Sequence, residues 1–436
     1  MLVRALRTGP ADPRFAREVV DLEKEKALLA AVLALRAVNA AYCLFRRKAR
    51  VRRVRRILVV KLDAIGDVVL ASPFLRELRT SFPPASITMI VSPATAPLLE
   101  LCPYIDRLLT FDPAKLSQGG PERGRLHAWA FGMRLYRFRF DLAILPRWDR
   151  DYYYGYYLLC GSGASRIVAF TRTMAAARDT WISRIERRDA TILCADAPEH
   201  EVTRNLRLLE AAGGHAHSDT LELWMSSQDR DLAAAWFASL GRSEARYKFA
   251  FGIGASSRVR CWPAEKFGEL GGLLAAQFDA DIILIGTGSE DRRRAESIIS
   301  NTHHSCIVSA VGALSLRQSA AFLARCDIFV GNDSGPMHLA SAVGVPIVEI
   351  CGLPEHVGGN HPSSPVRFGP RGPHTRIVRP VAPVGARAVA DGQAAALVPE
   401  AVSVAAVYGA VCELVADLPT SGRLQAAVRG TSEFER

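Results

Sequence analysis

Carboxylate and hydroxyl side chains stand directly after two short apolar runs in this sequence. Asp67 follows the run Ile57–Lys61 and a short loop, and Asp333 follows a second run that ends at Gly331. Short β-branched runs are typical of buried strands in a parallel sheet. In open α/β sheets, ligands bind at the carboxyl ends of the strands. The two positions therefore predict two ligand-binding edges.

Gly66 and Asp67 make up the first position. Gly66 removes a side chain where the backbone must turn sharply and let a ligand come close. Asp67 then lies at or near the start of a helix that is predicted to run to Leu78. Its carboxylate is expected to face the carboxyl end of the strand. The alternative is that Asp67 only caps the helix, since aspartate is among the preferred N-cap residues.

The second position, Cys326–Pro346, has the composition of an anion site. Asn332–Gly335 form a predicted turn, and Pro336 suits the first position of the following helix. The free N–H groups and the dipole of a first helical turn attract anions. Ser334 adds a hydroxyl, and His338 can donate to a phosphate oxygen. The alternative is a well-capped helix with a buried histidine.

A hydrolase triad of Asp333, Ser334 and His338 is excluded by two observations. The sequence has no G-x-S-x-G elbow, and triad members seldom lie within six residues of one chain. These three side chains, together with Gly335, are therefore predicted to hold a ligand rather than to form a nucleophile and its base.

A third loop, Gly252–Phe267, follows another predicted strand and contains Ser256, Ser257 and Arg260. Hydroxyls, backbone N–H groups and one guanidinium suit a diphosphate. The alternative is a solvated loop without a ligand. Trp262 and the proline after it are predicted to begin the next helix.

A fourth loop, Gly286–Arg293, stands at the end of the next predicted strand. Its Glu290 or Asp291 is expected to accept a hydrogen bond from a ribose hydroxyl, although a lone G-x-G is weak evidence. Asp279 and Asp281 resemble a D-x-D metal site. They precede their strand, at the edge opposite to the ligand edge, so we interpret them as structural and predict no metal site.

An aromatic run, Trp148–Tyr157, follows the predicted strand Asp141–Pro146. These rings either contact an acceptor sugar or lipid, or they pack inside the first domain. Gly66, Arg147 and Trp148 are the candidate acceptor-binding residues.

Strands alternate with helices from Ile57 onward, which predicts an α/β fold with parallel sheets covered on both faces. We expect a final helix at Ala401–Leu418 and an irregular segment at Pro354–Pro383, where proline, glycine and arginine are frequent. The predicted parts are an N-terminal helix and basic arm (1–55), a first α/β domain (56–228), a second α/β domain (229–383), and a low-complexity segment with a final helix and tail (384–436).

The composition is that of a globular protein with a sizeable core. The chain has 436 residues, 49% hydrophobic and 23% charged, and nine cysteines that stand singly without any C-x-x-C pair. Scattered cysteines of this kind indicate reduced thiols in a cytosolic protein. No run reaches the ~18 apolar residues of a membrane span. Secretion is excluded because the positive charge follows the N-terminal apolar region, whereas a signal peptide carries it before.

Much of the net charge of +11 belongs to one segment. Residues 46–56 contain eight Lys or Arg, and without them the net charge is +3. A long helix, Arg17–Arg47, is predicted just before this arm. It either packs on the body or lies on an anionic membrane, where each basic residue adds roughly 1 kcal/mol of attraction. Nucleic-acid binding is not expected, because no stacking platform or recognised module accompanies the charge.

Taken together, these motifs resemble the heptosyltransferases of bacterial lipopolysaccharide assembly, glycosyltransferase family 9. The resemblance covers residues from about 56 to about 380. Its two specific stretches are VVKLDAIGDVVLASPFLREL and GNDSGPMHLASAVGVPIVEICG, and the loops GASSRVRCWPAEKF and GTGSEDRR support it.

This resemblance implies a GT-B fold, in which two Rossmann-like domains face each other across a cleft. It implies transfer of heptose from ADP-heptose to a lipid-linked acceptor, with inversion and without a metal or cofactor. Asp67 corresponds to the proposed base of the family. Asp333, Ser334, Gly335 and His338 correspond to the segment that holds the donor diphosphate and sugar. The implied location is cytoplasmic, on the inner face of the bacterial inner membrane.

The chain departs from the family in three places. Arg260 stands where a lysine commonly contacts the phosphate, which keeps the charge but changes the geometry. The aromatic run after Arg147 and the N-terminal helix with its basic arm are unlike the family core. Two other classes stay open: an idle GT-B module that binds a nucleotide sugar or scaffolds a complex, and a nucleotide-sugar epimerase or hydrolase.

Overall fold

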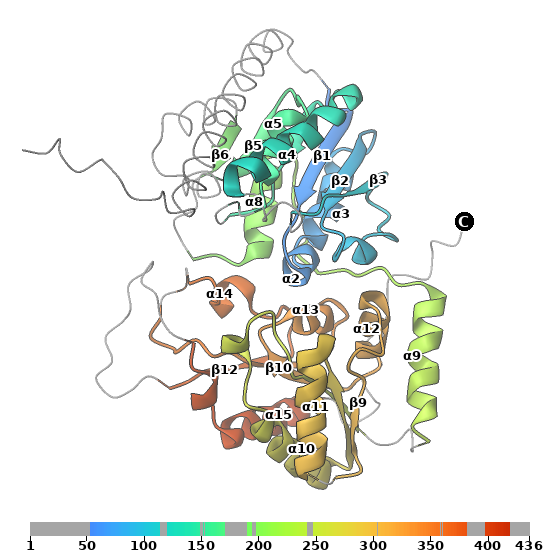
Figure 1. The fold of residues 1–436 in the computed structure, drawn as a ribbon, viewed down its shortest axis with the longest axis vertical. Coiled ribbons are helices and arrows are strands. Elements are labelled where there is room, and N and C mark those ends of the chain that lie inside the picture. The colour runs from blue at the N-terminus through green and yellow to red at the C-terminus, as the bar shows by residue number, and fades with distance from the viewer. Residues whose placement is uncertain are drawn as a thin grey trace, which may run out of the picture. The chain divides into compact units, whose positions relative to one another are not determined.

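Two six-stranded sheets, each accompanied by helices, make up the computed structural model (Figure 1). The predicted helix at 17–47, residues 46–52 of the basic arm, the low-complexity segment 384–396 and the tail from 419 lie outside the described residues. The structure describes residues 53–113, 120–148, 151, 153–170, 190–193, 198–241, 247–302, 304–357, 359, 361–381 and 397–418.

The first sheet has the strand order β3-β2-β1-β4-β5-β6. Its pairs β2–β3, β1–β4 and β4–β5 are parallel. The strand β1 is buried along nearly its whole length, as its β-branched sequence predicts. The strands are β1 (Arg56–Lys61), β2 (Ser86–Val91), β3 (Arg107–Thr110), β4 (Leu142–Ile144), β5 (Ile167–Phe170) and β6 (Ala190–Leu193).

The second sheet has the order β12-β11-β10-β7-β8-β9, and every adjacent pair is parallel. In both sheets the order reverses beside the first strand, so β1 lies next to β4 and β7 lies next to β10. The strands are β7 (Tyr247–Gly252), β8 (Ala280–Ile285), β9 (Ile307–Ser309), β10 (Ile328–Asn332), β11 (Ile347–Ile350) and β12 (Thr375–Val378).

The helices begin and end largely where their capping residues predict. Ser226 and Ser315 each form a capping box, and Gly213 ends α8 with a φ of 96°. The α-helices are α2 (Ile65–Val69), α3 (Ser72–Ser81), α4 (Gly120–Arg134), α5 (Gly155–Gly161), α8 (Glu201–Ala212), α9 (Ser227–Ser239), α10 (Ala264–Phe278), α11 (Gly288–Thr302), α12 (Leu316–Leu323), α13 (Gly335–Ala342), α14 (Pro365–Phe368) and α15 (Val404–Asp417).

Two predictions about these elements were wrong. The helix expected to run from Asp67 to Leu78 is two helices, because α2 ends at Val69 and α3 begins at Ser72. Pro73 explains the break, since its ring excludes the carbonyl four residues earlier and it has no N–H to donate. The segment Pro354–Pro383 is not irregular throughout, because it contains α14 and the edge strand β12.

Two compact units divide the chain. One comprises residues 1–62, 84–86 and 111–192, and its described elements include β1, β4, β5, α4 and α5. The other comprises residues 63–83, 87–110 and 193–436. It contains α2, α3 and the whole second sheet, and we refer to it as the larger unit.

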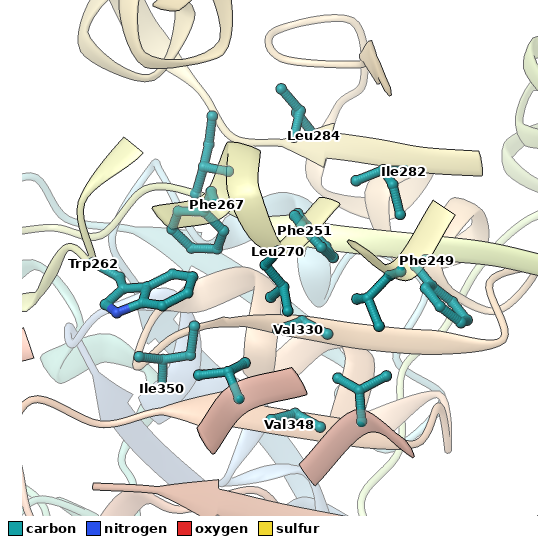
Figure 2. Packing of buried hydrophobic residues seen from close by; sticks show 14 of the residues in the cluster. Phe249, Phe251, Trp262, Phe267, Leu270, Ile282, Leu284, Val330, Val348 and Ile350 are labelled. Atoms are coloured by element: carbon teal, nitrogen blue, oxygen red, sulfur yellow. The ribbon is translucent and has the colours of Figure 1, made fainter. Parts of the chain in front are cut away.

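The core of the larger unit lies on one face of the second sheet. Alternate residues of β7, β8, β10 and β11 point into it, and α10, α11 and α15 cover them. Figure 2 shows the indole of Trp262 beside Phe267, with their rings 5.0 Å apart and nearly perpendicular. The last helix supplies Val404, Val407 and Val411 to this cluster. The domain core therefore extends well beyond residue 383.

A buried group of charges joins α8 to α14. Arg204 and Arg367 are 0% and 1% exposed, and both contact Oε1 of Glu201, at 2.9 and 2.7 Å. Next to them, Nε2 of His200 lies 3.0 Å from the carbonyl of Gly369. Because buried charges are costly unless they are paired, these contacts fix the start of α8 against a segment far along the chain.

Candidate functional site

The loops after β7 and β10 leave the second sheet at the point where its strand order reverses, which is where open α/β sheets bind ligands. Asn332 connects the two loops. Its Oδ1 accepts from the N–H of Trp262 at 2.9 Å, and its Nδ2 donates to the carbonyls of Gly252 and Gly254 at 3.3 and 3.4 Å. Asn332 is not among the candidate residues predicted from the sequence, because its partners are distant along the chain.

The N–H groups in the first turn of α13 are not capped by a side chain and can bind an anion. Ser334 is its N-cap residue, with extended backbone, but the Ser334 side chain accepts no capping hydrogen bond. Its Oγ is buried and has no partner among the described residues. The helix begins at Gly335, one residue before the predicted first position, Pro336. A hydroxyl and the uncapped N–H groups of one helical turn together form a suitable anion site.

Asp333 lies between two groups that carry or can carry positive charge. Its Oδ2 is 3.5 Å from Nη1 of Arg260, and its Oδ1 is 4.0 Å from Nε2 of His338. Burial raises the pKa of Asp333, Arg260 lowers it, and the negative charge of Asp67 raises it further. The structure thus places Arg260 and His338 beside Asp333, which directly precedes Ser334 and Gly335 at the start of α13.

His338 is neutral at physiological pH. It is 4% exposed, and burial lowers its pKa to about 3, with further lowering by the positive charges of His200 and Arg260. Its Nδ1 has no partner among the described residues. A neutral imidazole keeps one N–H donor, which can be directed at a phosphate oxygen without the cost of burying another charge.

Within the larger unit, α2 packs closely against α13. A Cβ atom at Gly66 would lie 2.3 Å from Cδ2 of His338, and one at Gly335 would lie 3.3 Å from Ile65. This close approach explains the need for glycine at 66. Ala64 is the N-cap residue of α2, and Asp67 is the third residue of that helix. Asp67 therefore stands close to the proposed anion site.

The remaining donor candidates are Ser256, Ser257 and Glu290, which follow β7 and β8. Ser256 and Ser257 are exposed on their loop. Glu290 pairs with Arg258 at 2.8 Å and Arg293 at 2.9 Å. These three residues help to line a pocket of about 520 Å³ near the starts of α10 and α11.

Asp291, the alternative ribose contact, lies between two glycine turns. Its Oδ2 accepts from the N–H of Thr287 at 2.9 Å. A Cβ atom at Gly254 or Gly286 would lie 2.2 or 2.6 Å from that same oxygen. Asp291 thus fills the gap between the loops that follow β7 and β8.

The acceptor candidates Arg147 and Trp148 follow β4, at the order reversal of the first sheet. The guanidinium of Arg147 lies over the ring of Tyr153, 5.1 Å from its centroid, while Trp148 is buried. Tyr156, later in the same aromatic run, is also buried. Part of this run therefore packs inside its unit rather than facing a ligand.

No group of three or more His, Cys, Asp or Glu in the described part of the chain is placed to bind a metal ion. Asp279 ends α10 with a φ of 46°, and Asp281 is buried in β8. Their positions agree with a structural role. None of the helices within the described ranges is long and apolar enough to span a membrane.

Comparison with known proteins gives a consistent result. The family model for glycosyltransferase family 9 (heptosyltransferase) matches residues 180–380. Lipopolysaccharide heptosyltransferase 2 of Salmonella typhimurium is 24% identical over 337 residues, which is 74% of this chain and 88% of that protein. Its Escherichia coli K12 counterpart is 24% identical over 350 residues, 78% of this chain and 92% of that protein.

Solved structures of similar proteins have the same fold. A family 9 glycosyltransferase from Veillonella parvula is similar with a TM-score of 0.65 and 22% identity, over 85% of this chain and all of that one. E. coli ADP-heptose lps heptosyltransferase II is similar with a TM-score of 0.61 and 19% identity, over 83% of this chain and 98% of that one. The predicted GT-B fold is confirmed.

Proposed function

Because this chain belongs to glycosyltransferase family 9, and is therefore a glycosyltransferase, we propose that it moves a heptose or related sugar from a nucleotide-diphosphate donor, such as ADP-heptose, to a lipopolysaccharide or other lipid-linked glycan. The transfer inverts the anomeric carbon and uses no metal. The observation that carries this proposal is the uncapped first turn of α13, with the unpartnered hydroxyl of Ser334 beside it.

The donor diphosphate binds at this turn through groups that stabilise negative charge. The N–H groups of α13 and the Ser334 hydroxyl donate to the phosphate oxygens, and Arg260 adds a guanidinium. His338, neutral because it is buried, donates one further hydrogen bond. Asp333 is left to accept from hydroxyls of the donor sugar. Ser256, Ser257 and Glu290 are proposed to join the nucleotide side of the site.

Inversion requires the acceptor hydroxyl to attack the anomeric carbon from the face opposite the diphosphate. Asp67 takes the proton of that hydroxyl, because a carboxylate within about 2.6–3.2 Å can act as its general base. α2 packs against α13, so the base is held near the sugar end of the donor. Gly66 and Arg147 are proposed to contact the acceptor, whereas the buried Trp148 supports Arg147 from within its unit.

The function is tested by incubating the protein with ADP-heptose and a lipid-linked acceptor in the presence of a chelator. We expect a glycosylated acceptor and free ADP, with little release of sugar when the acceptor is left out. Sugar released equally well to water would indicate a hydrolase instead. No consumption of ADP-heptose despite firm binding would indicate a module without catalytic activity.

Replacing Arg260 with alanine should weaken the binding of ADP by about 1.5–3 kcal/mol, the usual worth of a hydrogen bond to a charged group. The side chain is 31% exposed and its nearest acidic partner is Asp333 at 3.5 Å, so it is available to a phosphate. Calorimetric titration with ADP measures the change.

Arg258→Ala is the matched control for that measurement. Arg258 lies on the same short helical turn as Arg260, but its guanidinium is 76% exposed and pairs with Glu290. Binding of ADP to this variant should stay within about twofold of the parent, as for most exposed pairs. Equal loss in both variants would mean that the loop acts only through its net charge.

The acceptor is lipid-linked in this proposal, and the N-terminal segment is proposed to hold the enzyme on the cytoplasmic face of the inner membrane. The support is an apolar stretch before residue 46 and eight basic residues in 46–56. Basic residues of this kind attract anionic lipid and lose that attraction in high salt.

Removal of residues 1–54 should abolish this attachment. In low salt the full chain should pellet with vesicles that contain anionic lipid, whereas the shortened chain should stay in the supernatant. Vesicles of neutral lipid serve as the control. If the two chains distribute alike, the N-terminal segment has no role at the membrane.

A further inference from the structure

Glu349 is a buried carboxyl that the proposed mechanism leaves unused. It lies in β11, the strand between β10 and β12, and it is 1% exposed. Its Oε2 is buried without a hydrogen-bond partner among the described residues. An unpartnered buried acid costs stability and calls for an explanation. The site beside it supplies one.

Glu349 lies close to the end of β10, where the proposed donor site begins. It is paired with Gly331 of β10, so its neighbour on that strand has no side chain. Val348 and Ile350, the neighbours of Glu349 in β11, point into the apolar core in Figure 2, so the Glu349 side chain is on the opposite face of the strand. Asp333 follows directly after β10, and its negative charge acts on Glu349. The two carboxyls are therefore close enough for their charges to interact.

Three titratable or charged groups interact with Glu349. Cys351 of β11 stays neutral, because burial raises the pKa of its thiol to about 12. Arg379, after β12, donates to the carbonyls of Leu353 at 2.8 Å and of the next residue at 2.5 Å. The third group is the carboxyl of Asp333.

Two carboxyls that interact in a buried site do not both ionise easily. Burial raises the pKa of Glu349 well above its usual value, and the negative charge of Asp333 raises it further, while Arg379 opposes the shift. Asp333 has Arg260 at 3.5 Å, whereas no ion pair to Glu349 is found in the described part of the chain. The proton of the pair therefore belongs on Glu349.

We propose that Glu349 is a positioning residue that holds this proton, and so does not add its own negative charge to that of Asp333 beside the donor diphosphate. The inference rests on the proposed donor site. Loss of the proton would place a second negative charge next to a bound anion. Glu349 thus sets the upper pH limit of donor binding without touching the donor.

The proton itself is tested by unfolding Glu349→Gln and the parent over a range of pH. Unfolded glutamate is ionised above about pH 4.3, whereas folded Glu349 stays protonated. The folded parent then binds one more proton than the unfolded chain, so its stability falls as pH rises through this window. The variant lacks this loss, and its advantage in melting temperature should grow with pH.

Glu413→Gln, whose parent side chain is 72% exposed, is the matched control and should show no growing advantage. Glu349→Leu is a second neutral variant and should behave as Glu349→Gln does. If the difference in melting temperature between the parent and both neutral variants at 349 is constant with pH, Glu349 is ionised in the folded protein and the inference is wrong.

The effect on the site is tested by titration with ADP from about pH 6 to about pH 9. We expect the dissociation constant of the parent to rise about tenfold over that range, as one unfavourable charge contact would cause, and that of Glu349→Gln to stay nearly constant. An equal rise in both chains would overturn the inference. If neither chain binds ADP, the donor site itself is wrong, while the unfolding experiment still decides whether Glu349 holds a proton.

Discussion

Asp67→Asn is expected to turn over about 10²-fold more slowly than the parent, or slower still, with nearly unchanged affinity for the donor. The amide keeps the size and shape of the carboxylate but cannot take a proton from the acceptor hydroxyl. In the proposed mechanism Asp67 acts on the attacking oxygen, whereas α13 and Arg260 hold the diphosphate, so only the chemical step should suffer. The separation of kcat from donor affinity is the expected signature of a general base.

The measurement is a steady-state assay with ADP-heptose and lipid-linked acceptor, combined with titration by ADP. Asp231→Asn, an exposed aspartate of α9, serves as a control for the loss of one negative charge in the same unit. An Asp67→Asn enzyme that works at close to the parent rate would leave Asp67 as a helix residue of α2, and another base would have to be found.

Trp262→Ala is expected to lower the free energy of unfolding by about 3–5 kcal/mol, the usual range for removing a large aromatic side chain from a core. Trp262 is 0% exposed, and it packs against Phe267 in the cluster of Figure 2. Its Nε1 donates to the carbonyl of Val402 at 3.0 Å, and its backbone N–H donates to Asn332. The cavity would therefore weaken both the packing and the loop that carries Arg260.

Denaturant unfolding of the parent and the variant gives the difference directly. Trp262→Phe keeps an aromatic ring in the core but loses the bond to Val402, so it should cost about 1–2 kcal/mol. Lys266 also donates to that carbonyl, at 2.9 Å, and limits the loss. A cost of less than about 1 kcal/mol for Trp262→Ala would contradict the tight packing described here.

The sequence predicted which strands and helices carry the site better than it predicted the hydrogen-bond and ion-pair partners of the side chains. Short apolar runs followed by glycine and an acidic residue identify the ends of β1 and β10, because that pattern follows from local chain geometry. The Gly-Pro-Met-His turn of α13 is also local. By contrast, Asn332 gains its role from partners some 70 to 80 residues earlier in the chain. No local pattern distinguishes such an asparagine from an ordinary turn residue.

The partners of charged side chains could not be predicted from local sequence either. The sequence suggested a ribose contact for Glu290 or Asp291, but could not foresee that Glu290 pairs with arginines or that Asp291 lies between two glycine turns. Glu349 looked like one polar residue in an apolar strand. Its burial next to Asp333 depends on the pairing of β10 with β11. Side-chain partners of this kind are set by the sheet and not by neighbours in sequence.

The position of α15 has a consequence for how the protein is made. Val407 and Val411 complete a core to which β7, β8, β10 and β11 contribute, so the helix that closes the sheet is synthesised well after those strands. At about 5–20 residues per second, several seconds pass between the synthesis of β11 and that of α15. During this time the apolar face of β7, β8, β10 and β11 lacks the packing of α15. The second sheet therefore reaches its final packing only after α15 has been made, and a chain that stops before Val404 would display that face to other proteins.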